Sequence, residues 1–396
     1  MKKVFGGLLI LILSVFFSCT ETPSVKRTNS KFVVNLDTIP ITEEFYLSSF
    51  IKKESDSIVL LDTVTDALMG EINKLSVYDD YIVTLDRNVY KGVLSFNRNG
   101  KFLRKIGQNG QGPGEYVSPT DFTCSIEEDK IFVLDSRLRK ILTYRLSTGD
   151  FLKDIHIEPY ALRVHYYKGN LYVDNPSYGQ YKSENLLVRI NIETGDCEEY
   201  MISPNIYNAN YDGSLANEGG PFLQSTTGQF NYSQVFADVI LRKEGLSFYP
   251  YLQFTSKNWM NANDLTDINM KDFSASRKLV AKNKYYGINC FMETEDIIFC
   301  RIRKGVQTPY FFYNKRKGEM VLAKEMKDDI HFNNASWLFA RLFYGGYNEG
   351  GFCMYQSPES AERILAKECY KDPHFNALHK LGENFNGAVF FYKFKK

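Results

Sequence analysis

Short apolar runs separated by polar turns recur along the chain, and three of them end in an aspartate. These three runs cover residues 81–86, 130–135 and 170–174 and end in Asp86, Asp135 and Asp174. A second apolar run follows each of them, at 93–96, 141–144 and 186–190, and a glycine turn comes next at Gly100, Gly149 or Gly195. Alternating strands joined by glycine turns are typical of an antiparallel β-meander.

The spacing of these units predicts the fold. The three aspartates are 49 and 39 residues apart, close to the 40–50 residues of one four-stranded propeller blade. Weaker copies occur at 235–241 with 252–254, and at 296–300 with 310–313 and 316–321. A single blade cannot bury both of its faces, so the sheets must stack around an axis. We therefore predict an all-β chain that forms a β-propeller.

The blade number follows from the length. Residues 33–396 leave about 61 residues for each of six blades, which requires long insertions. Seven blades would leave fewer residues for insertions in each blade. We favour six four-stranded blades, with seven as the alternative, and expect short helical insertions at 272–285 and from Ser357 onward. The last strand, 387–392, stands alone, and we expect an amino-terminal strand such as 57–61 to complete its blade.

The amino terminus has the features of a secretory signal. Lys2 and Lys3 precede an apolar run over 4–17 that ends in Ser18-Cys19, and this run is shorter than the roughly 20 residues that cross a membrane. The end of the run resembles the lipobox of bacterial lipoproteins, which implies lipidation at Cys19. An ordinary signal peptide with an incidental cysteine is the alternative.

Cleavage before Cys19 divides the chain into a signal peptide at 1–18, a lipidated tether at 19–32 and a propeller domain at 33–396. The tether is rich in serine and threonine and reads as flexible. Thr20 follows the cysteine where an aspartate would resemble an inner-membrane retention signal. The interpretation is therefore export and anchoring to the outer membrane, on either its periplasmic or its cell-surface side.

Composition excludes several partners. Lys and Arg number 48 against 47 Asp and Glu, a formal charge of +1, so the protein lacks the net positive charge that would attract nucleic acid. The seven cysteines are too sparse for a disulfide scaffold, and the five histidines lack metal-ligand spacing. The sequence thus predicts neither a metal site nor another cofactor, and no nucleic-acid partner.

A glycine-rich stretch at 107–116 offers a possible phosphate cradle. A P-loop also needs a Gly-Lys-Ser/Thr sequence and a following helix, which are missing here. We instead expect a rigid corner between two blades, fixed by glycines with positive φ and by Pro113. Glu115 could act as an acid or base, but the sequence gives it no partner carboxylate.

Several short stretches carry a family resemblance. They are Phe-Asn-Arg-Asn-Gly-Lys-Phe-Leu at 96–103, Gly-Gln-Gly-Pro-Gly-Glu-Tyr at 110–116, Pro119, Val-Leu-Asp-Ser-Arg at 133–137 and Ile141. This region resembles NHL-repeat propellers, and more closely the six-bladed propeller lipoproteins of gut-type Gram-negative bacteria. The resemblance implies the propeller and the outer-membrane anchor, and it carries no established reaction.

Three insertions combine tyrosine with amide side chains, at 175–181, 205–231 and 344–349. An aromatic ring stacks on the apolar face of a sugar while amides bond its hydroxyls, so this composition suits neutral carbohydrate. The candidate binding residues are Tyr178, Tyr207, Asn208, Tyr211, Tyr347 and Asn348. Ordinary loop composition is the alternative.

Two functions follow for the whole chain. The favoured one is a recognition module that binds a glycan or a partner protein, and the alternative is a propeller hydrolase or lyase acting on an extracellular polymer. Asp86, Asp135 and Asp174 could line the central channel, but their place at repeated strand ends favours bonds to blade backbone.

Overall fold

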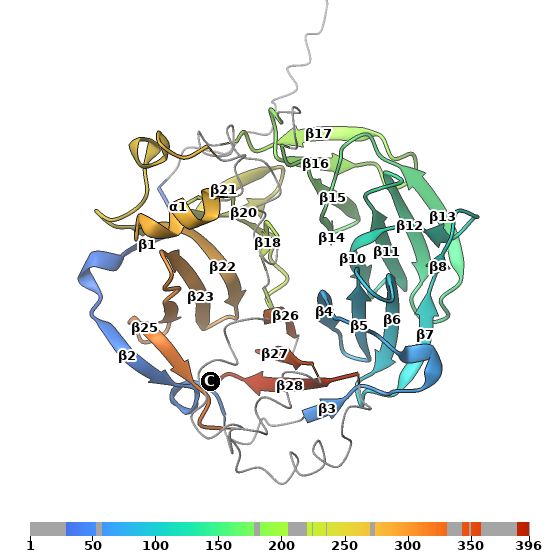
Figure 1. Cartoon of the computed structure of the whole chain (residues 1–396), viewed down its shortest axis with the longest axis horizontal. Helices are drawn as coiled ribbons and strands as arrows, with labels where there is room; N and C mark the ends of the chain where they lie inside the picture. The colour runs from blue at the N-terminus through green and yellow to red at the C-terminus, as the bar shows by residue number, and fades with distance from the viewer. Residues whose placement is uncertain are drawn as a thin grey trace, which may run out of the picture.

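The protein is a closed ring of six small β-sheets, seen here in a computed structural model (Figure 1). The structure describes residues 29–52, 58–177, 183–204, 220–223, 225–234, 236–269, 274–330, 343–347, 350–357 and 386–395. In every sheet the strand that comes first in its blade lies nearest the centre of the ring, and the later strands follow outward. The predicted six-bladed propeller is confirmed.

Blades 1 to 3 are regular antiparallel meanders of four strands each. Blade 1 contains β4 (Lys74–Val77), β5 (Tyr81–Asp86), β6 (Gly92–Asn97) and β7 (Phe102–Ile106). Blade 2 contains β10 (Pro119–Ser125), β11 (Lys130–Asp135), β12 (Lys140–Arg145) and β13 (Phe151–His156). Blade 3 contains β14 (Val164–Tyr167), β15 (Asn170–Asp174), β16 (Leu187–Ile190) and β17 (Cys197–Met201). The three aspartate-ended runs of the sequence are the second strands β5, β11 and β15.

Blades 4 to 6 follow the same order with longer connections. Blade 4 contains β18 (Phe222–Leu223), β19 (Asn231–Tyr232), β20 (Val239–Glu244) and β21 (Ser247–Thr255). Blade 5 contains β22 (Tyr285–Glu293), β23 (Ile297–Lys304), β24 (Tyr310–Asn314) and β25 (Glu319–Lys327). Blade 6 contains β26 (Phe343–Tyr347), β27 (Gly351–Gln356), β28 (Ala388–Lys393) and, from the other end of the chain, β3 (Ile58–Leu60).

Small elements fill the connections. A two-stranded parallel sheet joins β8 (Gln108–Asn109) to β9 (Glu115–Tyr116), and short 3-10 turns occur at η1 (Leu36–Thr38), η2 (Leu47–Ser49), η3 (Thr65–Ala67) and η6 (Ala262–Leu265). The helix predicted at 272–285 is present as the shorter α1 (Ala275–Ala281) because Tyr285 already begins β22. The helix predicted after Ser357 falls outside the described residues.

The amino-terminal segment closes the ring and also wraps its outside. As predicted, β3 pairs antiparallel with β28, with Val59 opposite Val389. Two earlier strands were not predicted: β1 (Phe32–Asn35) adds in parallel to β21, and β2 (Ile41–Tyr46) adds in parallel to β25. We call β1, β2 and β3 the N-terminal belt, because they cover the outer edges of blades 4, 5 and 6 in succession.

The hydrophobic core is divided among the spaces between blades. Between blades 5 and 6, the ring of Phe352 stacks on Phe299 with the centroids 6.2 Å apart and on Tyr392 at 4.7 Å. The Tyr392 hydroxyl donates to the buried carboxylate of Asp328 at 2.8 Å. Strands in the middle of a blade are therefore buried on both faces, which explains their nearly continuous apolar sequence.

The inner strands run in one direction, which gives the ring two distinct ends. On β10, Asp121 accepts from the Val164 amide at 2.9 Å and Thr123 accepts from the Tyr166 amide at 3.1 Å, so β10 and β14 ascend together. Because each blade alternates direction, its first-to-second and third-to-fourth turns lie at one end, which we call the turn face. Its second-to-third loop and the link to the next blade lie at the other end, the loop face.

Candidate functional site

The long connections of the propeller are all rooted at the loop face. Between blades they are 61–73, 107–118, 202–221, 256–284 and 328–342, and within blades they are 175–186 and 357–387. At the turn face the longest connection is 224–230. Binding residues in a rigid scaffold are concentrated on such long connections, so the loop face is the candidate functional surface.

Two of the tyrosine-rich connections are joined at their bases. The Asn175 amide donates to the Leu186 carbonyl at 2.9 Å, and the Leu186 amide donates to the Ile202 carbonyl at 2.8 Å. The connection 175–186 of blade 3 and the connection 202–221 to blade 4 therefore begin side by side. The sequence had named both as candidate binding insertions, and the backbone brings them to one corner of the ring.

A group of neutral polar side chains lies at this corner. Ser177 Oγ accepts from the Ser183 amide at 3.1 Å, Asn175 Nδ2 donates to the Asn185 carbonyl at 2.9 Å, and Gln234 Nε2 donates to the Ser203 carbonyl at 3.1 Å. Asn175, Ser177 and Ser183 are buried. We call Asn175, Ser177, Ser183 and Gln234 the blade 3–4 polar cluster. It fixes the roots of the connections through amide and hydroxyl groups.

Among the predicted binding residues, the structure describes Tyr347. Tyr178, Tyr207, Asn208, Tyr211 and Asn348 lie outside the described residues, as does Cys19. Tyr178 directly follows Ser177 of the polar cluster, and Tyr207 belongs to the connection that starts after Met201. Tyr347 is instead the last residue of β26, before the turn into β27, and therefore stands at the turn face. The topology thus places Tyr347 at the face opposite to the roots of the connections that contain Tyr178 and Tyr207.

Two of the repeated aspartates hold blade backbone in place. Asp86 accepts at Oδ1 from the amides of Asn88 and Val89, and at Oδ2 from those of Gly70, Glu71 and Tyr90, with distances of 2.8–3.1 Å. Asp135 likewise accepts with both oxygens, from the amides of Val117, Ser118, Arg137 and Leu138. Both are fully buried. They tie the loop after the second strand to the approach of the first strand, the structural role expected from their position.

Asp174 occupies the equivalent place, with fewer backbone donors among the described residues. Within that part of the chain, backbone amides bond only its Oδ1, from Leu162 and Arg163 at 2.7 Å each. Burial raises the pKa of Asp174 to about 6. Burial also acts against ionisation of Asp86, but the hydrogen bonds from Val89, Glu71 and its other backbone donors outweigh it and lower the pKa of Asp86. The same repeat position therefore carries opposite pH dependence in blades 1 and 3.

Replacing these aspartates by asparagine should separate the two cases. In Asp86→Asn the side-chain amide nitrogen replaces one of the two oxygens, and this nitrogen cannot accept the hydrogen bonds of the backbone amides. We therefore expect a loss of about 2–4 kcal/mol in unfolding free energy at pH 7. In Asp174→Asn the remaining oxygen still accepts both bonds, and we expect stability at pH 7 at least equal to the parent. Chemical denaturation of both variants measures this difference, and equal losses would contradict it.

The pH dependence provides a second readout. A raised pKa means that the stability contributed by Asp174 is present below its unfolded pKa of 3.8 and is lost as pH rises through about 6. A lowered pKa means that the contribution of Asp86 is present above 3.8 and is lost as pH falls through its folded pKa. The parent should therefore lose stability as the pH rises from about 4 to 6, and Asp174→Asn should not show this loss.

The glycine-rich stretch forms the rigid corner that the sequence predicted. Gly107 and Gly114 have φ of +69° and +73°, values that favour glycine. The Tyr144 hydroxyl donates to the Gly114 carbonyl at 3.0 Å, and the Tyr116 hydroxyl donates to the Ile106 carbonyl at 2.9 Å. A Cβ at Gly107 would stand 2.4 Å from the Tyr144 hydroxyl oxygen. The loop is thus packed against two buried tyrosines at the junction of blades 1 and 2.

Glu115 belongs to this corner as an acceptor. Its carboxylate receives the Gly112 amide at 2.8 Å and Gln108 Nε2 at 2.6 Å. These bonds, with the backbone bond from Gly112 first, lower the pKa of Glu115. An ionised carboxylate inside its own loop stabilises the turn.

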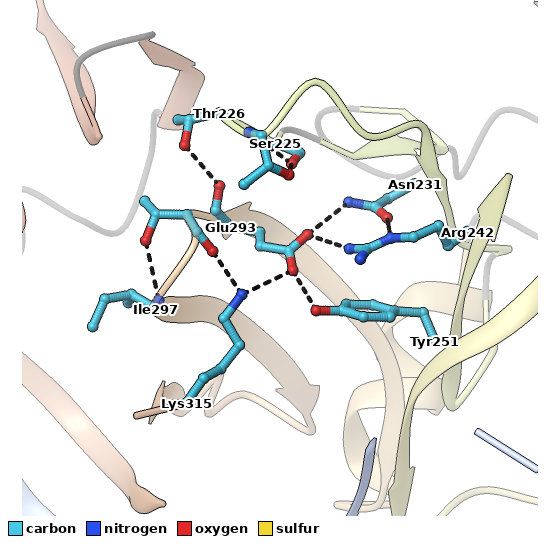
Figure 2. A network of polar contacts seen from close by, with 10 residues as sticks. Ser225, Thr226, Asn231, Arg242, Tyr251, Glu293, Ile297 and Lys315 are labelled. Carbon is cyan, nitrogen blue, oxygen red and sulfur yellow. Dashed lines mark hydrogen bonds and ion pairs between the residues drawn. The ribbon is translucent and has the colours of Figure 1, made fainter. Parts of the chain in front are cut away.

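A buried ion cluster that sequence reasoning missed joins blades 4 and 5 at the turn face (Figure 2). Its centre is Glu293, the last residue of β22, which is 2% exposed. One carboxylate oxygen is bonded by Arg242 and by Asn231 Nδ2 at 3.3 Å, and the other by the Tyr251 hydroxyl and by Lys315 Nζ at 3.2 Å. All four donors converge on Glu293 in Figure 2.

The residues that bind the Glu293 carboxylate also contact one another and the neighbouring backbone. The Arg242 guanidinium lies 3.3 Å from the centroid of the Tyr251 ring, and Lys315 Nζ also donates to the Thr294 carbonyl at 2.7 Å. The Glu293 carbonyl accepts from the Thr226 amide at 2.9 Å. Burial, the Glu293 charge and the bond to Glu293 raise the pKa of Tyr251. The cluster therefore joins two blades through a carboxylate that accepts from four side chains. In the sequence, its one signal was a charged residue at the end of an apolar strand.

Two further properties concern the described part of the chain. No helix there has the length and apolar character needed to cross a membrane. No group of three or more histidine, cysteine, aspartate or glutamate side chains within the described ranges is arranged to hold a metal ion.

The fold and its two faces define a six-bladed β-propeller with an elaborated loop face. Comparison with protein-family models gives a match over residues 31–393 to a domain of unknown function, DUF4934. The chain therefore belongs to the DUF4934 family. No curated protein matches the sequence.

Two solved structures are similar in fold. One is a candidate exported protein of Bacteroides fragilis NCTC 9343, with a TM-score of 0.74 and 18% identity over 92% of this chain and 100% of that one. The other is a member of the DUF4221 family from Bacteroides vulgatus ATCC 8482, with a TM-score of 0.51 and 11% identity over 87% of this chain and 98% of that one. At these identities the likeness concerns the fold.

Proposed function

We propose that the protein is an exported, outer-membrane-anchored recognition module whose loop face binds a glycan. The observation that carries the proposal is the corner between blades 3 and 4. There, two connections rich in tyrosine and asparagine start side by side over the blade 3–4 polar cluster. Rigid roots reduce the ordering cost of a binding loop, which raises affinity without new contacts.

The chemistry of this corner matches a neutral, hydroxyl-rich ligand. Asn175, Ser177 and Gln234 are uncharged, and amide groups both donate and accept hydrogen bonds, as sugar hydroxyls require. Tyrosines in the adjoining connections supply rings that stack on sugar faces. Binding through such contacts has little salt dependence, because no ion pair forms on association.

Single tyrosine changes should reveal the binding face. Each stacked ring contributes about 0.5–1.5 kcal/mol beyond its buried area, so Tyr178→Ala and Tyr207→Ala should each weaken glycan binding about 2- to 13-fold. Tyr347→Ala is the matched control, because Tyr347 stands at the opposite face. A glycan array identifies the ligand, and titration of the three variants measures the loss.

Three outcomes would oppose this proposal. Absence of any bound glycan on the array would end it, and so would equal affinity of the parent and both loop-face variants. A loss confined to Tyr347→Ala would move the site to the turn face, with Tyr347 and Asn348 as its residues. Turnover of a bound polymer would replace recognition by the hydrolase or lyase alternative.

The anchor is supported by the apolar run and Ser18-Cys19, and by the fold shared with a candidate exported protein of Bacteroides fragilis. Several acyl chains bury enough methylenes to make attachment effectively permanent. Cys19→Ala should therefore release the chain from the membrane fraction of a Gram-negative host, and lipid label should disappear with it. Retention of Cys19→Ala in that fraction, with an unlabelled parent, would refute the anchor.

A further inference from the structure

The chain enters the ring at the rim of blade 4. Lys31 donates its amide to the Pro250 carbonyl at 3.4 Å, and Ser30 Oγ donates to Gln253 Oε1 at 3.4 Å. From Phe32 onward the chain is paired as β1 along β21, the outermost meander strand of that blade. The entry point is therefore fixed on the side of the disc, away from the centres of both faces.

Two apolar side chains are exposed on the same rim. Leu246, in the turn between β20 and β21, is 74% exposed, and Val33 on β1 is 58% exposed. Leu246 precedes Pro250 by four residues along the strand, so it lies within about 13 Å of the entry point. An exposed leucine at a turn tip has no packing role in the ring, and it is positioned where a surface that holds the amino terminus would meet the protein.

The distance from Cys19 restricts how far the ring can turn. The roughly ten residues from Cys19 to Asn29 extend at most about 33–36 Å, and a flexible chain of this length has an r.m.s. span of about 16–19 Å. The propeller domain has a radius of gyration of about 21 Å, so it is about 50 Å across. Because the r.m.s. span of the tether is shorter than the radius of about 25 Å, the rim of blade 4 is on average the part of the ring nearest to the anchor.

We propose that the blade 4 rim, formed by Leu246 and Val33 next to the chain entry, is a phospholipid-contact surface that holds the propeller edge-on to the membrane. The proposal rests on the lipid anchor at Cys19. In this position blade 1, three places around the ring, points away from the bilayer. Both faces stand open at the sides, and the glycan-binding corner between blades 3 and 4 lies near the membrane.

Energy transfer to labelled lipid headgroups tests this orientation. The full mature chain, beginning at Cys19, is acylated chemically at its amino-terminal cysteine and bound to phosphatidylcholine vesicles that contain a headgroup acceptor. A coumarin amino acid replaces either Leu246 or Lys101, which occupy equivalent third-to-fourth turns of the opposite blades 4 and 1. We expect strong transfer from position 246 and weak transfer from position 101. Equal transfer from the two positions overturns the edge-on orientation.

A partition measurement tests the surface itself. With one synthetic acyl chain, membrane binding is marginal, so an added contact is visible. Leu246→Asp should lower the fraction bound to these vesicles several-fold, while Val306→Asp should leave it unchanged. Val306 is 88% exposed but belongs to the loop face of blade 5. Equal partition of the two variants overturns the contact surface.

The synthetic chain keeps this inference separate from natural anchoring. If Cys19→Ala stays in the membrane fraction of the host while the acylated chain still shows unequal transfer, the proposed anchor is wrong and the lipid-contact rim stands. If Cys19 carries lipid in the host but transfer is equal, the anchor stands and the edge-on orientation is wrong.

Discussion

Removing Ala388–Lys396 should leave the chain unable to fold. This truncation deletes β28, the third strand of blade 6, so β27 loses one of its two partner strands and β3 loses its pairing with the blade. Phe390 and Tyr392 are fully buried, and each such aromatic side chain is worth about 3–5 kcal/mol when it is removed from a core. The loss reaches the 5–15 kcal/mol of a typical protein, so we expect an insoluble or uncooperatively melting product.

A conservative variant separates this effect from a general sensitivity of blade 6. Tyr392→Phe keeps the ring that stacks on Phe352 and removes only the hydroxyl bond to Asp328. We expect it to fold and to lose about 1–3 kcal/mol, because one hydrogen bond to a buried carboxylate is lost. A truncated chain that stays soluble and melts as cooperatively as the parent would show that β28 does not close the ring.

Glu293→Gln should lower the unfolding free energy by about 3–5 kcal/mol. The change removes the one carboxylate that Arg242 and Lys315 share, and their side chains are only 11% and 16% exposed. Breaking a buried ion pair from one side is costly because the remaining charges lose compensation without regaining water. For a domain of this length the loss corresponds to about 4–7 °C in melting temperature.

Glu193→Gln is the matched control. Glu193 pairs with Lys153 at the surface and its side chain is 73% exposed, so its loss should change stability by less than about 0.5 kcal/mol. Differential scanning calorimetry of both variants gives the comparison. Similar midpoints for Glu293→Gln and Glu193→Gln would mean that the cluster at the turn face does not hold blades 4 and 5 together.

The local pattern of apolar and polar residues was sufficient to predict the repeated strands and the closure of the ring. The runs that end in Asp86, Asp135 and Asp174 became second strands with the expected bounds, because strands between two blades are buried on both faces and so read as apolar runs. Closure was predictable because a single strand after a long insertion leaves a blade incomplete. The strand at 57–61 supplied the missing partner as β3.

Other features depended on contacts that no local pattern contains. The parallel additions of β1 and β2 join residues 32–46 to residues 252–327, and neither short strand shows strong alternation. Glu293 is bonded by Asn231, Arg242 and Tyr251 of another blade, a set that only the ring brings together. For the candidate site, composition selected the two connections, while their common root between blades 3 and 4 came from the backbone.

The N-terminal belt also sets the order in which the chain can fold as it is synthesised. Its strands leave the ribosome first, yet their partner strands β21, β25 and β28 are made only after blades 1 to 3. Contacts between such distant residues form slowly, because the loop entropy must be lost before they are gained. The belt therefore keeps the early part of the chain unpaired until the carboxy-terminal blades exist. The ring cannot close while β28 is missing, so a chain that is still being made has an open ring until its final residues are added.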